Sequence, residues 1–247
     1  MTDTSIDELL KTYPRSRPLL SSAHETIYVE EYKLNRGGQG LLYNTTQRLE
    51  SWLHRMVARQ AGNGTILELG AGSLNHVPYE APDVLYDCVE PFLALYENSP
   101  HQSRIRNLYQ DINDVSENAR YDRILSIAVL EHLENLPSIV ARSGLLLNDN
   151  GVFQGSIPTE SGLLWGLSWR LTTGVAYRLR TGLDYATVMR HEHINNAREI
   201  TAVLEYFFSK VKVWRFPTPL FHVSFYTYLE AISPRHDRCI RYLKSVD

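Results

Sequence analysis

The sequence predicts an α/β fold built on a doubly wound, mostly parallel sheet. Apolar, β-type runs alternate with helical segments along the chain, the pattern of strands joined by crossover helices. The first run, Thr65–Leu69, ends in a turn that holds Gly70 and Gly72, and Glu90 closes the next run. A glycine turn after a first strand lets backbone approach a ligand closely, and an acid about 20 residues later can bind ribose hydroxyls. These features predict a nucleoside-type cofactor.

The remaining elements are predicted from apolar periodicity and turn signals. Further strands are expected at Val84–Val89, Ile105–Tyr109, Tyr121–Leu133, Gly151–Pro158, Val211–Phe216 and Val223–Leu229. Helices are expected at Thr45–Gln60, Glu134–Leu147 and Ala197–Phe208. Asn44 is predicted to cap the first of these helices, because its side chain can accept hydrogen bonds from the first turn.

The glycine turn is a poor match to a dinucleotide site. Such sites have Gly or Ala at a third small position, where the helix packs tightly and the pyrophosphate lies, and here that position is Asn75. A cofactor without phosphates needs less from the turn, so S-adenosylmethionine is preferred over NAD. Pro78 and Pro82 follow, and because proline breaks or shortens helices, the first helix after the turn should be short or irregular. His76 is expected in a surface loop.

Composition narrows the function classes. The chain has 247 residues, 43% of them hydrophobic, and a net charge of −3, which supports a sizeable core and weighs against a nucleic-acid partner. Cys88 and Cys239 form no metal-binding spacing, and Cys88 falls in a predicted buried strand, which favours a reduced, cytoplasmic setting. The acidic N-terminus lacks the apolar core of a signal peptide, and no apolar run approaches the roughly 18 residues of a membrane span.

Four ordered motifs resemble those of the class I S-adenosylmethionine-dependent methyltransferases, particularly the branch that acts on small molecules. They are Glu68-x-Gly70-x-Gly72, Glu90, Asp111–Ile112 and the segment Ala128–Leu133. The resemblance covers residues 65–158 well and the final strands loosely. It implies a Rossmann-like sheet of seven strands with the last one antiparallel.

The resemblance also implies cofactor-binding residues at these motifs, namely Glu68, Gly70, Ala71, Gly72, Glu90, Asp111, Ile112, Ala128 and Val129. The glycine turn would lie beside the methionine moiety, and Glu90 would accept hydrogen bonds from the ribose. Asp111 would bind the adenine amino group, and Ile112 would offer its backbone. The segment from Ala128 would lie beneath the sulfonium. Leu74 stands where the family has a third glycine.

The chain is interpreted as a single methyltransferase domain with four parts: an N-terminal arm (1–60), a cofactor-binding core (61–158), a substrate-lid insertion (159–195), and a closing helix with strands (196–247). In the arm, the glycine-rich turn Arg36–Gly40 is either a plain flexible turn or a hinge. As a hinge it would let residues 24–43, including Tyr28, close over the cofactor and exclude water.

The insertion should select the acceptor, because it leaves the fifth strand at the carboxyl edge of the sheet, where ligands bind. Its candidate substrate residues are Trp165, Trp169, Arg178, Tyr185 and Arg190. Aromatic faces suit sugars or flat rings, and arginine suits phosphate or carboxylate. Alternatively, the leucines of the insertion simply pack a helical lid onto the domain. A peripheral membrane contact is a third interpretation, which a short polar face disfavours.

Three histidines are candidate catalytic bases: His132, which follows the fourth strand, and His191 and His193, which precede a helix. A hydroxyl acceptor must lose a proton, and histidine titrates near neutral pH. His132 has the alternative role of capping the following helix. His191, Glu192 and His193 form a weak metal pattern, and no metal is predicted.

The predicted function is methyl transfer from S-adenosylmethionine to a small hydroxylated acceptor, with a sugar, nucleotide-linked sugar or glycan end preferred. An aromatic or quinone-like natural product is the alternative within the same class. A nucleotide-dependent oxidoreductase, a non-catalytic cofactor-binding protein and an RNA methyltransferase are alternatives from other classes.

Overall fold

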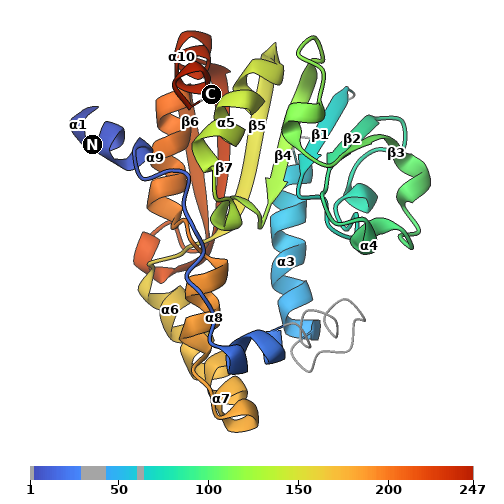
Figure 1. The fold of residues 1–247 in the computed structure, drawn as a ribbon. Coiled ribbons are helices and arrows are strands. Elements are labelled where there is room, and N and C mark those ends of the chain that lie inside the picture. The colour runs from blue at the N-terminus through green and yellow to red at the C-terminus, as the bar shows by residue number, and fades with distance from the viewer. Residues whose placement is uncertain (1–2, 29–42, 60–63, 247) are drawn as a thin grey trace.

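The computed structural model describes residues 3–28, 43–59 and 64–246. Within these residues, seven strands form one sheet in the order β3-β2-β1-β4-β5-β7-β6 (Figure 1). β1 to β5 run parallel, and β7 runs antiparallel to both β5 and β6. The predicted doubly wound, mostly parallel sheet with an antiparallel last strand is confirmed.

The strands coincide with the apolar runs of the sequence, with two corrections to the bounds: β4 ends at Ile127 and not at Leu133, because Ala128 takes a left-handed backbone, and β5 begins at Leu147, four residues before the predicted start. Their bounds are β1 Thr65–Leu69, β2 Leu85–Val89, β3 Ile105–Tyr109, β4 Tyr121–Ile127, β5 Leu147–Pro158, β6 Phe208–Pro217 and β7 Ser224–Pro234. In β4 the adjacent residues Ile124 and Leu125 are both fully buried, because helices or loops cover both faces of the sheet there. A strand buried on both faces appears in the sequence as a continuous apolar run.

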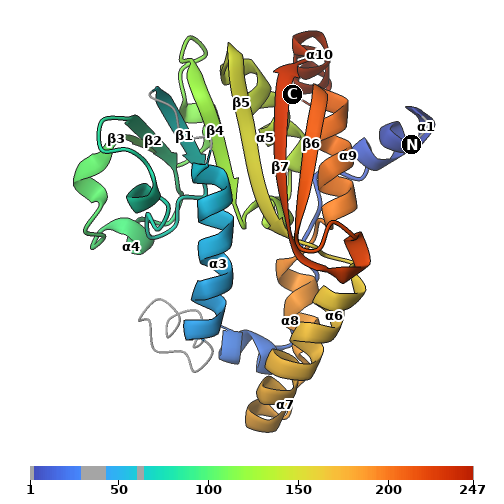
Figure 2. The same ribbon diagram turned by 180° about the vertical axis from the view of Figure 1, so that it is seen from behind.

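Helices pack on both faces of the sheet. α3 (Tyr43–Ala58) crosses one face and contacts β4, β5 and β7 (Figure 2). The opposite face is covered by α5 (Leu136–Leu146), α9 (Ala197–Phe207) and α10 (His236–Val246) (Figure 1). The short α4 (Leu93–Tyr96) follows β2.

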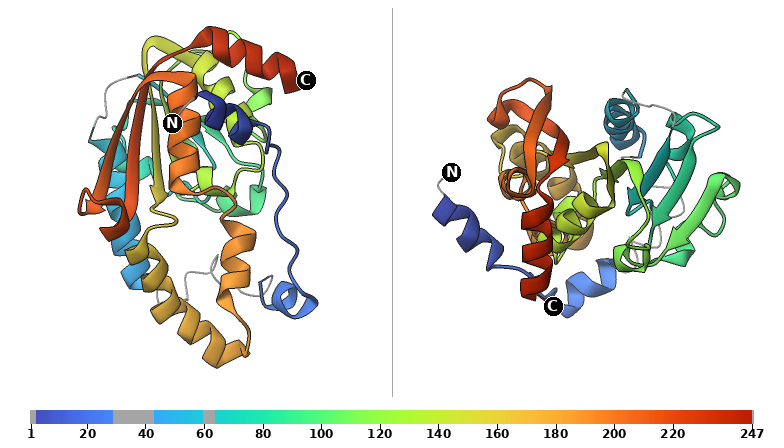
Figure 3. Two further views of the ribbon diagram at one scale, coloured as in Figure 1. Left: turned by 90° about the vertical axis from the view of Figure 1, so that its left-hand side faces the viewer. Right: turned by 90° about the horizontal axis from the view of Figure 1, so that it is seen from above.

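The predicted helical insertion follows β5 and is confirmed. It consists of α6 (Leu163–Trp169), a π-helical segment (Arg170–Gly174), α7 (Val175–Thr181) and α8 (Tyr185–Glu192). These helices project beyond the carboxyl ends of the strands (Figure 3).

The predicted N-terminal arm extends from α9 to the helices of the insertion. It begins with α1 (Asp3–Leu10), which packs on α9, and it contains a second helical segment at residues 22–28. Arg15 fixes the arm through an ion pair of 2.9 Å with Glu199, the residue that also completes the capping box of α9 with Asn196. The Arg36–Gly40 turn lies outside the described residues, so the hinge hypothesis stays a prediction.

Two local predictions were wrong. Asn44 does not cap α3, because the helix begins at Tyr43 and Asn44 lies inside it, whereas a capping residue has non-helical backbone angles. His76 is not a surface residue but is fully buried. The segment around His76 is irregular, as the prolines predict: it forms a turn and a single 3-10 helix, Val77–Tyr79.

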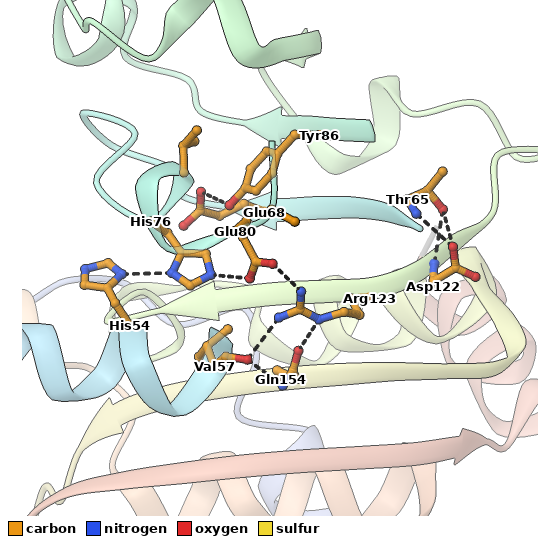
Figure 4. Close-up of polar contacts among 12 residues, drawn as sticks. His54, Val57, Thr65, Glu68, His76, Glu80, Tyr86, Asp122, Arg123 and Gln154 are labelled. Carbon is orange, nitrogen blue, oxygen red and sulfur yellow. Dashed lines mark hydrogen bonds and ion pairs between the residues drawn. The ribbon is translucent and has the colours of Figure 1, made fainter. Parts of the chain in front are cut away.

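A buried polar network anchors this irregular segment to the sheet (Figure 4). From β4, the Arg123 guanidinium donates to Glu80 Oε2 at 2.7 Å, to Gln154 Oε1 of β5 at 2.7 Å and to the Val57 carbonyl of α3 at 3.0 Å. Both charged side chains are almost completely buried. Four parts of the chain therefore meet at one guanidinium.

Histidines extend the network on the far side of Glu80. His76 Nε2 donates to Glu80 Oε1 at 2.8 Å, and His54 Nδ1 of α3 lies 3.1 Å from His76 Nδ1. Burial alone would raise the pKa of Glu80, but hydrogen bonds from His76 and Arg123 outweigh it and lower that pKa to about 2. Burial and the neighbouring His76 lower the pKa of His54 to about 4. Glu80 is thus held as a carboxylate.

In the described parts of the chain, no helix combines the length and the apolar character needed to cross a bilayer.

The buried ion pair generates the first prediction. Arg123→Met removes the cation and leaves Glu80 buried without its charge partner, which typically lowers the free energy of unfolding by about 3–5 kcal/mol. Urea denaturation followed by circular dichroism measures the change. The free energy of unfolding of Arg123→Lys should lie between those of the wild type and Arg123→Met, because lysine keeps the positive charge but lacks the planar guanidinium that binds several acceptors.

The matched control is Arg241→Met. Arg241 pairs with Asp237 at 3.6 Å in an i,i+4 arrangement on α10, where both side chains are about 70% exposed, and exposed pairs contribute about 0–1 kcal/mol. An Arg123→Met protein no less stable than the Arg241→Met protein would contradict the anchoring role.

Candidate functional site

In the glycine turn after β1, another side chain packs against Gly70, whereas the space beside Gly72 is open. Gly70 and Gly72 have φ values of +66° and +51°, a region that side chains rarely adopt. A Cβ on Gly70 would lie 2.5 Å from Val129 Cγ2, whereas a Cβ on Gly72 would meet no atom within 4 Å. Leu74 keeps the left-handed backbone with φ +66°, although it replaces the family's third glycine.

Glu90 is held against the open side of this turn. Its side chain is buried, and its carboxylate accepts hydrogen bonds from the backbone N–H of Gly72 at 2.8 Å and of Phe92 at 3.0 Å. Phe92 and Leu93, which follow it, are more than half exposed. A fixed carboxylate therefore lies next to an apolar surface and an open backbone turn.

Glu68 lies in β1 just before the turn, and Ala71 lies between the two glycines of the turn. Both are buried, and Tyr86 of β2 donates to Glu68 Oε2 at 2.8 Å. Burial raises the pKa of Glu68 to about 7, against the opposing effects of His76 and the Tyr86 hydrogen bond. Burial thus moves the pKa of this carboxyl group toward neutrality.

Asp111 and Ile112 follow β3 at the same edge. Asp111 is exposed, and one of its oxygens accepts from Asn113 N at 2.8 Å, so it caps the short 3-10 helix Ile112–Asp114. Ile112 itself is buried in the core.

Ala128 and Val129 form the corresponding bend after β4. Ala128 is exposed and has φ +54°, a conformation that costs an alanine roughly 1–2 kcal/mol. Its N–H donates to the Ser156 carbonyl of β5 at 2.7 Å, which holds the bend in place. Backbone strain of this kind is frequent at ligand sites.

His132 and His193 meet just beyond this bend. Their ring centroids are 4.9 Å apart and their planes nearly perpendicular. His132 Nδ1 donates to the Glu192 carbonyl at 2.7 Å. The N-cap residue of α5 is Asn135, so the alternative that His132 caps α5 is not what the structure shows.

Glu160, in the turn two residues beyond β5, orients His193. His193 Nδ1 donates to Glu160 Oε1 at 2.6 Å, and Trp165 Nε1 donates to the same oxygen at 2.6 Å. In neutral His193 the other nitrogen, Nε2, is then the proton acceptor. Burial lowers the pKa of His193, but the Glu160 hydrogen bond and the negative charges of Glu160, Glu131 and Glu192 outweigh it and raise that pKa.

Acidic side chains surround the histidine pair. Glu131 is buried, and its Oε2 has no hydrogen-bond partner within the described residues. Burial raises the pKa of Glu131, although His132 and His193 oppose the shift. Glu192 accepts a hydrogen bond from the Tyr28 hydroxyl and lies 3.7 Å from Arg17, which ties the N-terminal arm to the site.

His191 is not part of this pair. Its Nδ1 donates to the Pro18 carbonyl at 2.8 Å, and its ring meets Tyr28 edge-on. It therefore contacts the N-terminal arm. In the described parts of the chain no group of three or more His, Cys, Asp or Glu side chains could hold a metal ion.

A pocket of about 460 Å³ opens between α6 and α8. Of the predicted substrate residues, Trp165, Trp169 and Arg190 line it, together with His193 and Glu160. Tyr185 packs edge-on against Trp169 with ring centroids 5.9 Å apart, and Arg178 is exposed on α7; neither lines the pocket.

Sequence reasoning missed Glu160 and Glu131 as site residues. Glu160 follows the predicted strand Gly151–Pro158, and Glu131 lies near the carboxyl end of the predicted strand Tyr121–Leu133, so the rule that placed ligands at this edge was itself the available signal.

A family described as "Methyltransferase domain" matches residues 41–207, well over half of the chain. The chain belongs to this methyltransferase family. The family match makes it an S-adenosylmethionine-dependent methyltransferase. A search of curated protein sequences finds no match.

Solved structures share the fold at low identity. The plantazolicin methyltransferase BpumL in complex with SAH has 12% identity and a TM-score of 0.59, with 93% of this chain and 99% of BpumL covered. The N-methyltransferase NodS from Bradyrhizobium japonicum WM9 has 14% identity and a TM-score of 0.51, with 76% and 87% covered.

An O-methyltransferase family protein from Burkholderia thailandensis has 10% identity and a TM-score of 0.50, with 78% of this chain covered. The methyltransferase described here spans 57% of that protein's length. At these identities the likeness concerns the fold and does not identify the acceptor.

The glycine turn generates the second prediction. Gly70→Ala should destabilise the methyltransferase more than Gly72→Ala. Both variants place a side chain in a left-handed conformation, at about 1–2 kcal/mol, but only Gly70→Ala also overlaps Val129, which adds about 1–3 kcal/mol. Urea denaturation of the two variants measures the difference.

The Val129→Ala background is the control, since it removes both of the γ carbons that an added Cβ would meet. The penalty of Gly70→Ala should shrink there, and the penalty of Gly72→Ala should not. Equal penalties for both glycines in the wild-type background would contradict this account of the turn.

Proposed function

We propose that this methyltransferase O-methylates a small hydroxylated acceptor, preferably a saccharide that carries an anionic group. The observation that carries the proposal is the pocket in which Trp165, Trp169 and Arg190 lie beside the His193–Glu160 pair. Aromatic faces pack on sugar rings, arginine binds carboxylate or phosphate, and a half-buried histidine can remove a hydroxyl proton.

The residues at the β1 and β2 ends fit S-adenosylmethionine. The open side of Gly72 leaves room for a ligand against the backbone, and the fixed Glu90 carboxylate can accept hydrogen bonds from ribose hydroxyls. The exposed Phe92 and Leu93 offer an apolar surface to adenine, and Asp111 would bind its amino group. These features support the cofactor-binding residues that the motifs imply.

The methionine end would lie between the two strained bends. Gly70 and Ala71 after β1 and Ala128 and Val129 after β4 face one another, since Val129 fills the space above Gly70. The histidine pair begins three residues beyond Val129. This order along one edge supports an acceptor bound between cofactor and histidines.

When bound, S-adenosylmethionine supplies a methyl group on a sulfonium that an oxygen nucleophile can displace. In the proposed mechanism His193 Nε2 takes the proton of the acceptor hydroxyl. Glu160 keeps Nδ1 protonated and stabilises the imidazolium that forms, and Trp165 holds Glu160 in place. Positioning supplies most of the remaining acceleration.

The third prediction tests the cofactor site. Glu90→Gln should weaken S-adenosylhomocysteine binding by about 1.5–3 kcal/mol, the typical contribution of a hydrogen bond to a charged group. Isothermal titration calorimetry measures the affinity, and thermal melting confirms that the turn still folds.

Glu97→Gln is the matched control, because Glu97 is exposed and only seven residues away. Its affinity should equal that of the wild type. Full affinity in Glu90→Gln would remove Glu90 from the cofactor site, while no binding by folded wild-type protein would count against the cofactor assignment itself.

The acceptor class is tested by a screen with methyl-labelled S-adenosylmethionine. Uronic acids, sugar phosphates, neutral sugars and phenols are offered in parallel. The proposal expects transfer to anionic saccharides, and expects Arg190→Gln to raise KM for these more than for neutral sugars. Transfer to phenols alone would favour the aromatic natural-product alternative.

The fourth prediction concerns pH. His193 must be neutral to accept a proton, so turnover should rise with pH through its raised pKa. His193→Gln should lower kcat by about 100-fold or more and remove this rising limb, with little effect on cofactor affinity. His132→Gln and His191→Gln test the other two predicted bases in the same assay.

Glu160→Gln tests whether Glu160 acts on His193 or only stabilises the fold. Because Glu160 raises the pKa of His193, removing its charge should shift the rising limb to lower pH while the maximal rate falls. His236→Gln, on the exposed face of α10, should leave the profile unchanged. A Glu160→Gln profile with an unshifted limb would contradict the pairing.

A further inference from the structure

The insertion carries a row of exposed apolar side chains. Large aliphatic residues recur at every fourth position along its continuous helical stretch, and each is between 47% and 84% exposed: Leu163, Leu167, Leu171, Val175 and Leu179. We call this row the leucine stripe. Single exposed leucines are ordinary, but a contiguous apolar patch marks an interaction surface.

The helix geometry keeps the stripe on one side. Residues at i and i+4 are neighbours on a helix surface. A four-residue repeat drifts around a 3.6-residue α-helix by about 40° per step. The wider π-helical turns at Arg170–Gly174 lie in the middle of the stripe and counter this drift. Such π segments are rare and concentrate at functional sites.

Cationic side chains flank the stripe without acidic ones. Between positions 161 and 183 the chain has no Asp or Glu, and its three charged residues are Arg170, Arg178 and Arg180. All three are exposed. The Arg170 guanidinium lies over the ring of Trp169, 4.4 Å from its centroid, so it is held close to the helix surface.

We infer that the leucine stripe docks the methyltransferase on an anionic lipid surface. Helices that lie in a bilayer interface combine an apolar face with arginine or lysine on the polar face, and their binding scales with buried apolar area and with attraction to anionic lipids. Juxtamembrane cations are also drawn to negative headgroups. The stripe and its three arginines meet both conditions.

A second copy of the chain fits this surface less well. A two-fold interface would pair the stripe with itself. It would bring the three arginines of each copy together, and the stretch supplies no carboxylate to neutralise them. A lipid surface supplies the missing negative charge.

The leucine stripe is accessible to a lipid surface because the insertion projects from the rest of the molecule. α6 and α7 extend beyond the sheet at one end of the molecule (Figure 3). Leu220 and Val223 lie in the loop that packs against α6 and are also exposed, which widens the apolar area. Leu163, Leu167 and Arg170 also line the acceptor pocket. The part of the surface outside the pocket therefore consists of Leu171, Val175 and Leu179 with Arg178 and Arg180.

Vesicle co-sedimentation tests the inference. The full-length protein is mixed with vesicles of phosphatidylcholine alone or with added phosphatidylglycerol. It should bind the mixed vesicles and largely remain in solution with pure phosphatidylcholine, and high salt should weaken binding. The doubly substituted Leu171→Glu/Leu179→Glu protein should bind about tenfold more weakly or worse, because it removes two apolar side chains and adds two negative charges.

Two further variants complete the design. Arg178→Gln/Arg180→Gln should reduce the preference for phosphatidylglycerol. Ile240→Glu, an equally drastic change at an exposed position of α10, should bind like the wild type. Circular dichroism confirms folding of each variant, and binding requires neither cofactor nor acceptor, so the result is independent of the proposed catalytic function.

Three outcomes would overturn the inference: no binding to phosphatidylglycerol vesicles, equal binding by the stripe variant and the wild type, or equal binding to both vesicle types. A wild-type dimer in analytical ultracentrifugation that the stripe variant converts to a monomer would assign the surface to a second copy instead.

Discussion

The ion pair between Arg123 and Glu80 is the interaction on which the cofactor side of the molecule depends. Because prolines prevent a regular helix after β1, the segment up to β2 lacks the helical hydrogen bonds that would otherwise hold it on the sheet. Removing two charges from water is costly, and only good geometry and further hydrogen bonds compensate for it. Gln154, His76 and the Val57 carbonyl supply those bonds. The glycine turn begins this segment, so its geometry rests on the same contacts.

β4 connects this buried network to the candidate catalytic site. Arg123 lies within the strand, and the strained Ala128 and the histidine pair follow its carboxyl end. β4 also pairs with both β1 and β5, with Leu69 beside Ser126 and Ile127 beside Ser156. Displacement of this strand would therefore alter the glycine turn, the Ala128 bend and the position of Glu160 together.

Local patterns in the sequence predicted the strands, the glycine turn and the insertion, because apolar runs, turn residues and prolines act over a few residues. The pairings that complete the site are long-range: Arg123 and Glu80 are 43 residues apart, and His193 and Glu160 are 33 apart. A single sequence does not reveal such partners, which is why His76 was placed at the surface. The sequence did contain a partial signal of the network. Arg123 and Gln154 interrupt apolar runs that otherwise indicate buried strands, and a buried charge requires a partner.

The candidate site combines the carboxyl edge of the sheet with the projecting insertion. The proposed base is oriented by Glu160, which lies in the turn two residues beyond β5 and accepts a further hydrogen bond from Trp165 of α6. The aromatic and arginine side chains that would contact the acceptor belong to helices outside the sheet. Proton transfer requires positional accuracy, whereas acceptor choice requires variable surface chemistry. Because Trp165 belongs to α6 and His193 is the C-cap residue of α8, changes in these helices alter the acceptor contacts and the orientation of the base together.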